Sequence, residues 1–378
     1  MKLPRAYYEA IATLTGCIIG AGILGIPYVV VRSGFWTGML VLGIIGLAVL
    51  FIHLLLGEVT LRTSACHQLV GYAEKYLGRS GKFWMTASMV IGVYGALIAY
   101  TLGVSESLSQ VFGGAQWLWA IVFYFLMAWL IYGGLKTLER SELLIGLCML
   151  GLFALVAVVL FTSRHFSAFQ WTGFSWQRLL IPYGVILFAF TGTAAIPELR
   201  EEMQKCKLLT RRAIIFGSLI PIVVYALFTA AVVGVTGVFT TEVATIGVAS
   251  LLGGIAFVLL HLFAIAAMST SFLALGYALM QMYHLDFRLP KSKSWALTLA
   301  VPLVLIMLGA RSFVNVLELA GVFAGGITGI IVVLMHAAAR RRSDRKPEYS
   351  IKVNWVVYGL LIALFAIGMI YELFLLVV

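Results

Sequence analysis

Two short stretches of the sequence combine glycines, small residues and a proline inside long apolar runs. Residues 16–27 read GCIIGAGILGIP, and residues 188–198 read FAFTGTAAIPE. Glycine and proline both tend to interrupt helices. An interrupted helix inside a membrane offers N–H groups to an anion and carbonyls to a cation, and an amino acid zwitterion needs both. The alternative is that the glycines only allow close helix packing and the prolines are tolerated kinks.

The composition around these stretches is that of a membrane protein. Of the 378 residues, 62% are hydrophobic and only 11% are charged, whereas soluble domains carry about 25% charged residues. The mean hydropathy is +1.05. The apolar runs are continuous and far longer than the alternating strands of about ten residues that build an outer-membrane barrel. A soluble fold and a barrel are therefore excluded, and an all-α integral membrane protein is predicted.

The apolar runs and the polar breaks between them predict eleven spanning helices. The predicted spans cover residues 7–31, 35–61, 83–112, 116–135, 142–162, 178–199, 209–237, 246–284, 295–309, 313–337 and 353–377. The run 246–284 is too long for one straight span. Either it is strongly tilted, or its first part, around 251–254, belongs to an outer loop.

The basic residues indicate the orientation. All but four of the 26 lysines and arginines lie in the N-terminal segment and in alternate loops; the exceptions are Arg32, Arg164, Arg178 and Arg311. Positively charged loops stay in the cytoplasm. We therefore expect a cytoplasmic N-terminus and, with an odd number of spans, a C-terminus outside. The same bias explains the basic run 340–346 more simply than an anionic-lipid site does.

The two glycine- and proline-rich stretches lie in the first and the sixth predicted span. Two sets of five spans, about 7–162 and 178–337, would cross the membrane in opposite directions because five is odd. This is the pattern of an inverted repeat, whose broken helices form the substrate site. The eleventh helix, about 353–377, is left over. The chain 1–378 is expected to be a single transporter domain.

The sequence resembles a known family at these same stretches. Residues 20–28 (GAGILGIPY) resemble the first-helix signature of the amino acid/auxin permease family, a branch of the LeuT-like amino acid-polyamine-organocation superfamily. Residues 187–202 (LFAFTGTAAIPELREE) look like the sixth helix of that family. The resemblance covers essentially the whole chain and implies a LeuT-like fold and amino acid transport by alternating access.

The resemblance also implies a substrate site. It would place the substrate carboxylate on Gly20, Ala21 and Gly22, and the ammonium group on carbonyls near Phe188, Ala189 and Thr191. The substrate side chain would face Tyr100, Phe190 and Met268, for which ordinary packing in the bundle is the alternative. Because no charged residue lies in the middle of these spans, a neutral or aromatic amino acid is expected.

A small hydroxylic cluster in the eighth span suits a hard cation. Ala267, Thr270 and Ser271 match the set that LeuT-like sodium symporters use for Na⁺, with Gly16 and Ile19 matching on the first helix. Import coupled to Na⁺ is therefore expected. The alternative is that the hydroxyls bond their own helix backbone.

A proton-coupled amino acid symporter or exchanger of the same fold is the second possibility. The basic residue that proton-coupled relatives place on the fifth helix is missing, since residues 143–161 contain no Lys, Arg or His. Buried carboxyls remain as proton carriers, with Glu106 and Glu318 as the candidates. Glu318 is also a gating candidate together with Arg32 or Arg311.

Histidines, charged pairs and cysteines occur in the spans and at their ends. His53 and His261 are lone histidines, for which bonds to neighbouring helices are expected. Glu58 with Arg62, and Glu198 with Arg200, are candidates for pairing at an inner gate, with interfacial solvation as the alternative. The four cysteines, Cys17, Cys66, Cys148 and Cys206, lack metal-ligand spacing and predict neither zinc nor disulfides.

Other classes of protein fit the sequence poorly. It contains no H-E-x-x-H, no G-x-S-x-G and no intramembrane Asp pair, which argues against an enzyme. No filter or ring of charges indicates a channel. We expect a multi-pass protein of the cell (inner) membrane whose partners are an amino acid and membrane lipid. No cofactor, nucleic acid or obligate protein partner is expected.

Overall fold

The structure is a computed structural model that describes residues 4–133, 151, 153–285 and 287–377. Helices make up the regular structure of this part of the chain, which contains no strand. The first half contains α1 (Arg5–Ile18), η1 (Ala21–Gly25), α2 (Ile26–Ser33), α3 (Phe35–Arg62), α4 (Leu69–Phe112) and α5 (Gln116–Gly133). The predicted span 142–162 falls partly outside the described residues.

The second half contains further helices and a π-helical turn, η7. These are α7 (Tyr183–Ala189), α8 (Ala195–Glu202), α9 (Thr210–Thr236), α10 (Ala244–Leu252), α11 (Gly254–Leu285), α12 (Lys291–Met307), α13 (Phe313–Ala320), η7 (Gly321–Gly325), α14 (Gly326–Arg341) and α15 (Trp355–Val377). Short 3-10 turns occupy parts of the connecting segments.

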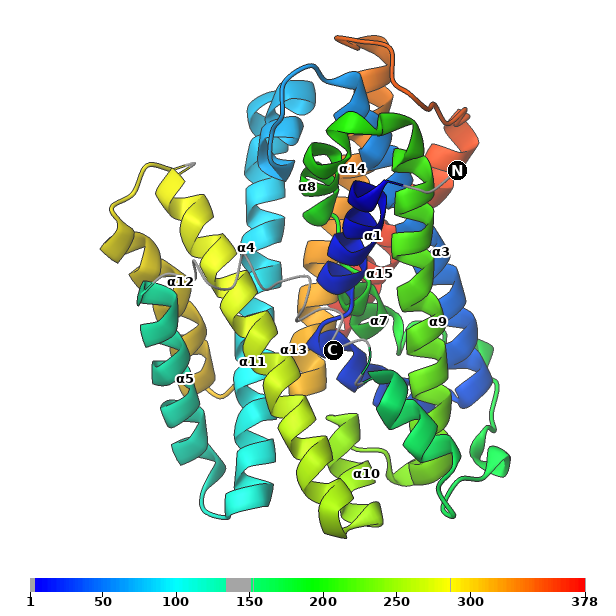
Figure 1. Ribbon diagram of the computed structural model, residues 1–378, viewed down its shortest axis with the longest axis vertical. Helices are drawn as coiled ribbons and strands as arrows, with labels where there is room; N and C mark the ends of the chain where they lie inside the picture. Colours follow the sequence, from blue (N-terminus) through cyan, green and yellow to red (C-terminus); the bar gives the residue numbers. More distant parts are fainter. Residues whose placement is uncertain (1–3, 134–150, 152, 286, 378) are drawn as a thin grey trace.

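The helices form two groups around α4 (Figure 1). On one side α5, α11 and α12 pack against α4 and against one another. On the other side α1, α3 and α8 pack against α9, and α14 connects this group to α4 and α15. The N-terminus and the loop 342–354 lie at one end of the molecule, and α10 lies at the other.

Seven helices of the described residues are long and apolar enough to cross a membrane, and a bent pair can count as an eighth. The bent pair is α1 with the segment 21–33, at an angle of 44°. Large apolar side chains remain exposed on the outside of the bundle, among them Leu47, Phe125, Trp129 and Leu360. Surfaces of this kind are stable in lipid and unfavourable in water.

The predicted spans differ from the helices at identifiable residues. The span predicted for 83–112 corresponds to the part of α4 after a kink at Gly78, where φ is +70°, and the part 69–77 before the kink was not predicted. The long run 246–284 is divided, since Gly253 and Gly254 have φ of +61° and +55° and separate α10 from α11. Its first part is thus neither part of one tilted span nor simply a loop: residues Ala244–Leu252 form the separate short helix α10, and only Gly253 breaks the helix before α11.

Candidate functional site

The first helix is interrupted where the sequence predicted it. α1 ends at Ile18, and Ile19 (ψ 85°) and Gly20 (φ −119°, ψ −159°) are not helical. The chain then makes a short 3-10 turn before α2 begins at Ile26, with Pro27 in its first turn, where a missing N–H costs little. The break lies inside the bundle, because all five residues of the 3-10 turn are buried.

The sixth predicted span is also interrupted. α7 ends at Ala189 and α8 begins at Ala195, with Pro197 in its first turn. Between them the N–H of Thr191 donates to the carbonyl of Phe188 over 3.0 Å, in a tight turn. The last four carbonyls of α1 and of α7 have no donor within the regular pattern of their own helix, as at any helix end.

The two breaks pack directly against each other. A Cβ atom placed on Gly22 would lie 2.9 Å from the Cα of Ala189, so only glycine fits there. The hydroxyl of Tyr225, on α9, lies 2.6 Å from the carbonyl oxygen of Ile18 and 2.9 Å from that of Ala189. The structure thus brings the expected carboxylate and ammonium segments together, and it adds a tyrosine that the sequence did not single out.

The expected side-chain contacts of the substrate lie in different places. Tyr100 is buried on α4, near Cys17 of α1. Met268 is buried on α11 and fills the space that a Cβ on Gly103 of α4 would occupy. Phe190 instead packs toward α3 and α9, with its ring centroid 5.0 Å from that of Tyr225.

Ser271 of the hydroxylic cluster on α11 reaches the first break. A Cβ on Gly20 would lie 3.1 Å from Oγ of Ser271, so this serine faces the first break. Thr270 donates its hydroxyl to the carbonyls of Ala266 and Ala267, each over 3.0 Å. A hydroxyl that donates to its own helix still has oxygen lone pairs for a cation. The donor set therefore fits Na⁺ chemically, while the bonds of Thr270 to its own helix are those of the alternative interpretation.

The gating candidates do not meet in this conformation. Glu318 packs against Gly184 of α7 and lies within electrostatic range of Glu372 in α15. Arg32 places its guanidinium 5.3 Å from the ring centroid of Tyr28, and its carbonyl accepts from Arg178. No ion pair joins Glu318 to Arg32 among the residues that the structure describes.

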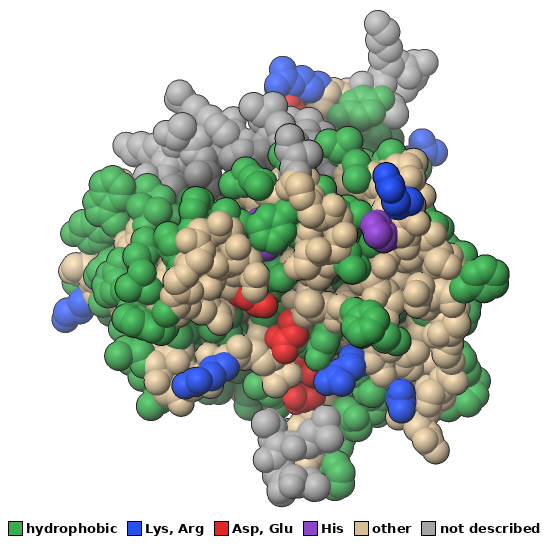
Figure 2. Space-filling view, turned by 90° about the horizontal axis from the view of Figure 1, so that it is seen from below, with side chains coloured by type: hydrophobic (Ala, Val, Ile, Leu, Met, Phe, Trp, Pro, Cys, Tyr) green, Lys and Arg blue, Asp and Glu red, His purple; other side chains and the backbone are tan. Residues whose placement is uncertain are grey.

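A contact that the sequence did not indicate holds the α10 end of the molecule. Glu242, just before α10, accepts from the hydroxyl of Ser312 over 2.9 Å and from the backbone N–H of Val314 over 3.2 Å. These donors lie in the first turn of α13, where a carboxylate is favourable. Figure 2 views this end and shows acidic side chains near its centre.

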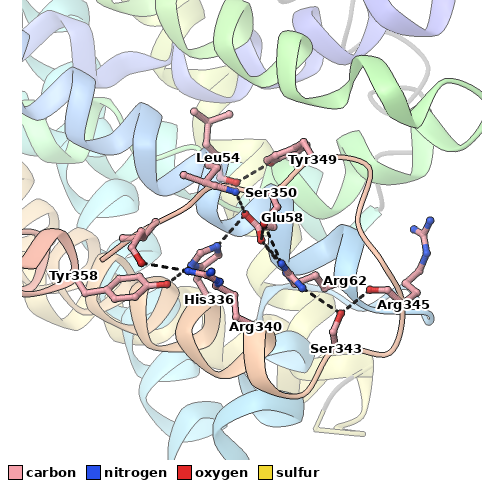
Figure 3. A network of polar contacts seen from close by, with 12 residues as sticks. Leu54, Glu58, Arg62, His336, Arg340, Ser343, Arg345, Tyr349, Ser350 and Tyr358 are labelled. Atoms are coloured by element: carbon pink, nitrogen blue, oxygen red, sulfur yellow. Dashed lines mark hydrogen bonds and ion pairs between the residues drawn. The ribbon is translucent and has the colours of Figure 1, made fainter. Parts of the chain in front are cut away.

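The other end is held by a buried polar network around Glu58 (Figure 3). The carboxylate of Glu58 lies 2.7 Å from a guanidinium nitrogen of Arg62 and 3.1 Å from Nε2 of His336. It also accepts from the hydroxyl of Ser350 and the N–H of Ile351. The expected pair of Glu58 with Arg62 is therefore present, and it anchors the loop 342–354.

Arg200 bonds the loop that connects α3 and α4. Its buried guanidinium donates to the hydroxyl of Tyr72 and to the carbonyls of Thr63, Ser64 and Ala65, over 2.6 to 3.1 Å. Multiple donors in a planar fork suit a cluster of carbonyls. Arg200 therefore fixes α8 to the loop that connects α3 and α4.

The two intramembrane histidines differ from each other. His53 bonds a neighbouring helix, as expected, because its Nδ1 lies 2.9 Å from the hydroxyl of Ser218 on α9. For His261 that expectation was wrong, since its Nδ1 lies 2.8 Å from the carbonyl of Phe257 in the same helix. A backbone bond of this kind places no constraint on a neighbouring helix.

Two broken helices packed break to break in a helical membrane bundle are the pattern of secondary transporters built from inverted repeats. The tryptophan/tyrosine permease family matches residues 6–373, and the chain belongs to this family. The chain is thus a multi-pass membrane transporter and not an enzyme. The finer resemblance to the amino acid/auxin permease family is not confirmed by this match.

Individual relatives and solved structures agree with this assignment. "Glutamine transporter 2" of Aliivibrio fischeri is 25% identical over 90% of this chain and 91% of its own length. "Tyrosine-specific transport system 1" of Haemophilus influenzae is 26% identical over 57% of this chain and 54% of its own. Among structures, inward-facing Mhp1 has a TM-score of 0.67 at 14% identity, with coverage of 98% and 89%. MhsT with L-phenylalanine has a TM-score of 0.65 at 16% identity, with coverage of 99% and 98%.

Proposed function

We propose that this chain imports neutral or aromatic amino acids across the cell membrane by alternating access, driven by Na⁺. The observation that carries the proposal is the packing of the two breaks at Gly22 and Ala189. The backbone N–H groups of one break and the carbonyls of the other then lie close enough to bind the carboxylate and the ammonium group of the same amino acid.

The substrate class is supported by the chemistry around the breaks. Tyr225, whose hydroxyl bonds the carbonyls at both breaks, and Phe190, which lies in the second break, are uncharged. An uncharged site disfavours a charged substrate side chain, which would lose its hydration without gaining a partner. The curated relatives are, by their names, transporters of glutamine and tyrosine.

Na⁺ is proposed to bind between the first break and α11. Ser271 faces Gly20, and Thr270 lies beside it with its hydroxyl proton already used in its own helix. Gly16, Ile19 and Ala267 would supply carbonyl oxygens, which are ligands that hard cations prefer. The ion would thereby link α1 to α11, two helices from the two groups around α4.

The orientation in the membrane is part of the proposal. The N-terminus lies at the same end as the loop 342–354 (Figure 1), which contains Arg342, Arg345, Lys346 and Lys352. Basic loops favour the cytoplasm. We therefore place this end in the cytoplasm and the α10 end outside, with the whole chain forming one transport domain in the inner membrane.

Proton coupling is the second candidate, and it rests on one observation. The carboxyl of Glu318 lies within electrostatic range of the carboxyl of Glu372. A carboxyl in an apolar bundle can bind and release a proton during transport. Coupling of this kind would leave transport independent of the hydroxyls on α11.

Uptake into proteoliposomes separates the two candidates. Radiolabelled amino acids are supplied with an inward Na⁺ gradient in one arm, and with an inward proton gradient and no sodium in the other. We expect uptake with Na⁺, competition by leucine or tryptophan in preference to arginine or glutamate, and a loss of about tenfold or more in Thr270→Ala and Ser271→Ala.

Thr298→Ala is the matched control. Thr298 also donates its hydroxyl to its own helix, over 2.9 Å to the carbonyl of Ser294, but it lies on α12. Its uptake is expected to equal that of the wild type. Uptake driven by protons alone would overturn Na⁺ coupling and favour Glu318. An ion conductance that is equal with and without amino acid would overturn the carrier itself.

A further inference from the structure

Tyr225 lies where the two helix breaks meet. Its side chain on α9 is fully buried. Its hydroxyl lies 2.6 Å from the carbonyl oxygen of Ile18 and 2.9 Å from that of Ala189. Because Ile18 is the last residue of α1 and Ala189 the last of α7, one side chain joins the ends of two broken helices.

The hydroxyl has one proton for two acceptors. A phenol donates one hydrogen bond, so the two carbonyls share or exchange it. Both carbonyls belong to helix ends, where the regular backbone donor is missing. Without the hydroxyl the carbonyl of Ile18 would keep only the N–H of Gly20, 2.9 Å away. The carbonyl of Ala189 would lose this partner in a buried space, which is unfavourable.

The tyrosine ring is held firmly in its position. It packs against Phe190 with ring centroids 5.0 Å apart and planes inclined by 45°. Its helix α9 packs along α1 and α3, so it is part of the bundle and not of a loop. The hydroxyl therefore extends from a regular, packed helix to the two breaks.

We propose that Tyr225 is a positioning residue of the substrate site, whose hydroxyl sets the spacing between the two breaks. This inference rests on the proposed function, because the spacing matters only if one amino acid bridges both breaks. A preset spacing lowers the free-energy cost of reorganising the protein when substrate binds. Loss of the hydroxyl should then weaken substrate binding more than it weakens the fold.

A purely structural role predicts a different result, and a second tyrosine provides the comparison. Tyr124 on α5 is buried to a similar degree, and its hydroxyl donates over 2.6 Å to the carbonyl of Leu299 on α12. This bond also joins two helices, but it lies away from both breaks. Phenylalanine at either position removes one buried tyrosine–carbonyl hydrogen bond and no carbon atom.

The test compares Tyr225→Phe with Tyr124→Phe in the full-length protein. Both variants are reconstituted in proteoliposomes, and KM and Vmax are measured for an amino acid that the wild type transports. For Tyr225→Phe we expect KM to rise about tenfold, which corresponds to about 1.4 kcal/mol, with a smaller change in Vmax. For Tyr124→Phe we expect KM within about twofold of the wild type.

Each outcome decides the inference. An unchanged KM in Tyr225→Phe, with only a lower thermal midpoint as in Tyr124→Phe, would show that the bond is merely structural. A lower KM would show that the hydroxyl competes with substrate, which also overturns the inference. A wild type that transports no amino acid would instead contradict the proposed function.

A second substitution covers the case that Tyr225→Phe does not fold. 3,5-Difluorotyrosine at position 225 keeps the hydroxyl and the ring, but it changes the strength of the hydroxyl as a donor. We expect a changed KM when the analogue replaces Tyr225 and an unchanged KM when it replaces Tyr124. An unchanged KM at both positions would refute the positioning role without any loss of folded protein.

Discussion

At Gly22 the two breaks come so close that a single methyl group does not fit. A Cβ there would lie 2.9 Å from the Cα of Ala189, a backbone atom that cannot rotate away. The side chains of Ala189 and Phe188 are also close, each 3.2 Å from the position of this Cβ. A larger residue must therefore push the break of α7 away from that of α1.

We expect Gly22→Ala to reduce amino acid uptake by about tenfold or more, because small displacements of a binding group have large effects on rate. The measurement is initial uptake into proteoliposomes at several substrate concentrations. Gly43→Ala is the control, since a Cβ on Gly43 of α3 meets nothing within 4 Å. Full activity in Gly22→Ala would mean that the close approach of the breaks is not needed for transport.

Glu58 is expected to stabilise the fold through its buried partners. Its side chain is fully buried, and that of Arg62 is only 13% exposed. On the opposite side His336 uses Nδ1 to contact the hydroxyl of Tyr358, 2.7 Å away on α15 (Figure 3). Removing Glu58 would leave the buried Arg62 charge without its carboxylate and the loop 342–354 without its anchor.

We expect Glu58→Ala to lower the free energy of unfolding by about 3 kcal/mol, the usual cost of removing one partner from a buried ion pair. Thermal or denaturant unfolding in detergent measures this. Glu74→Ala is the control, because Glu74 and Lys82 are 48% and 37% exposed in their 3.0 Å pair and such pairs contribute under about 1 kcal/mol. Equal losses in both variants would rule out a special role for the buried network.

At the scale of the elements, the sequence predicts the breaks well and their partners poorly. Glycines and Pro27 mark the first break because they act on the backbone of their own segment. The break of α7 is marked in the same way before Pro197. Residues 134–150 fall outside the described part of the structure, so the fifth predicted span is tested only in its second half.

The sequence does not predict the contacts between segments that are distant along the chain. Tyr225 is one of 16 tyrosines, and nothing in its neighbourhood on α9 indicates that it reaches Ile18 and Ala189. Arg200 is likewise close in sequence to Glu198 but bonds carbonyls near Thr63. Local patterns determine where a helix ends, whereas tertiary packing determines which side chain meets that end.

For the whole molecule, the two ends are held by different means. At the α10 end, Glu242 ties the segment before α10 to Ser312 and Val314 at the start of α13. Toward the other end, α1 packs mainly on α9 and α8, and the side chain of Cys17 near its end is exposed. Alternating access requires that such contacts form at one end while they open at the other.

The contact of Glu242 should therefore bias the conformational equilibrium. A hydrogen bond to a charged group contributes about 1.5–3 kcal/mol and one between neutral groups about 0.5–1.5 kcal/mol. The neutral amide in Glu242→Gln therefore weakens the contact and shifts a two-state equilibrium by roughly fivefold to tenfold. We expect Glu242→Gln to favour the state that is open at the α10 end. In that state α1 should close against the rest of the bundle and cover Cys17.

Labelling of Cys17 with a maleimide reports this shift. Cys66, Cys148 and Cys206 are first replaced by serine, and the labelling rate in proteoliposomes is then compared between this parent protein and its Glu242→Gln variant. A slower rate is expected for Glu242→Gln, whereas Ser250→Ala, which loses only a hydroxyl bonded within α10, should label like the parent. If the rate instead stays the same in Glu242→Gln, the α10 contact does not control access to α1, and the two ends open and close independently.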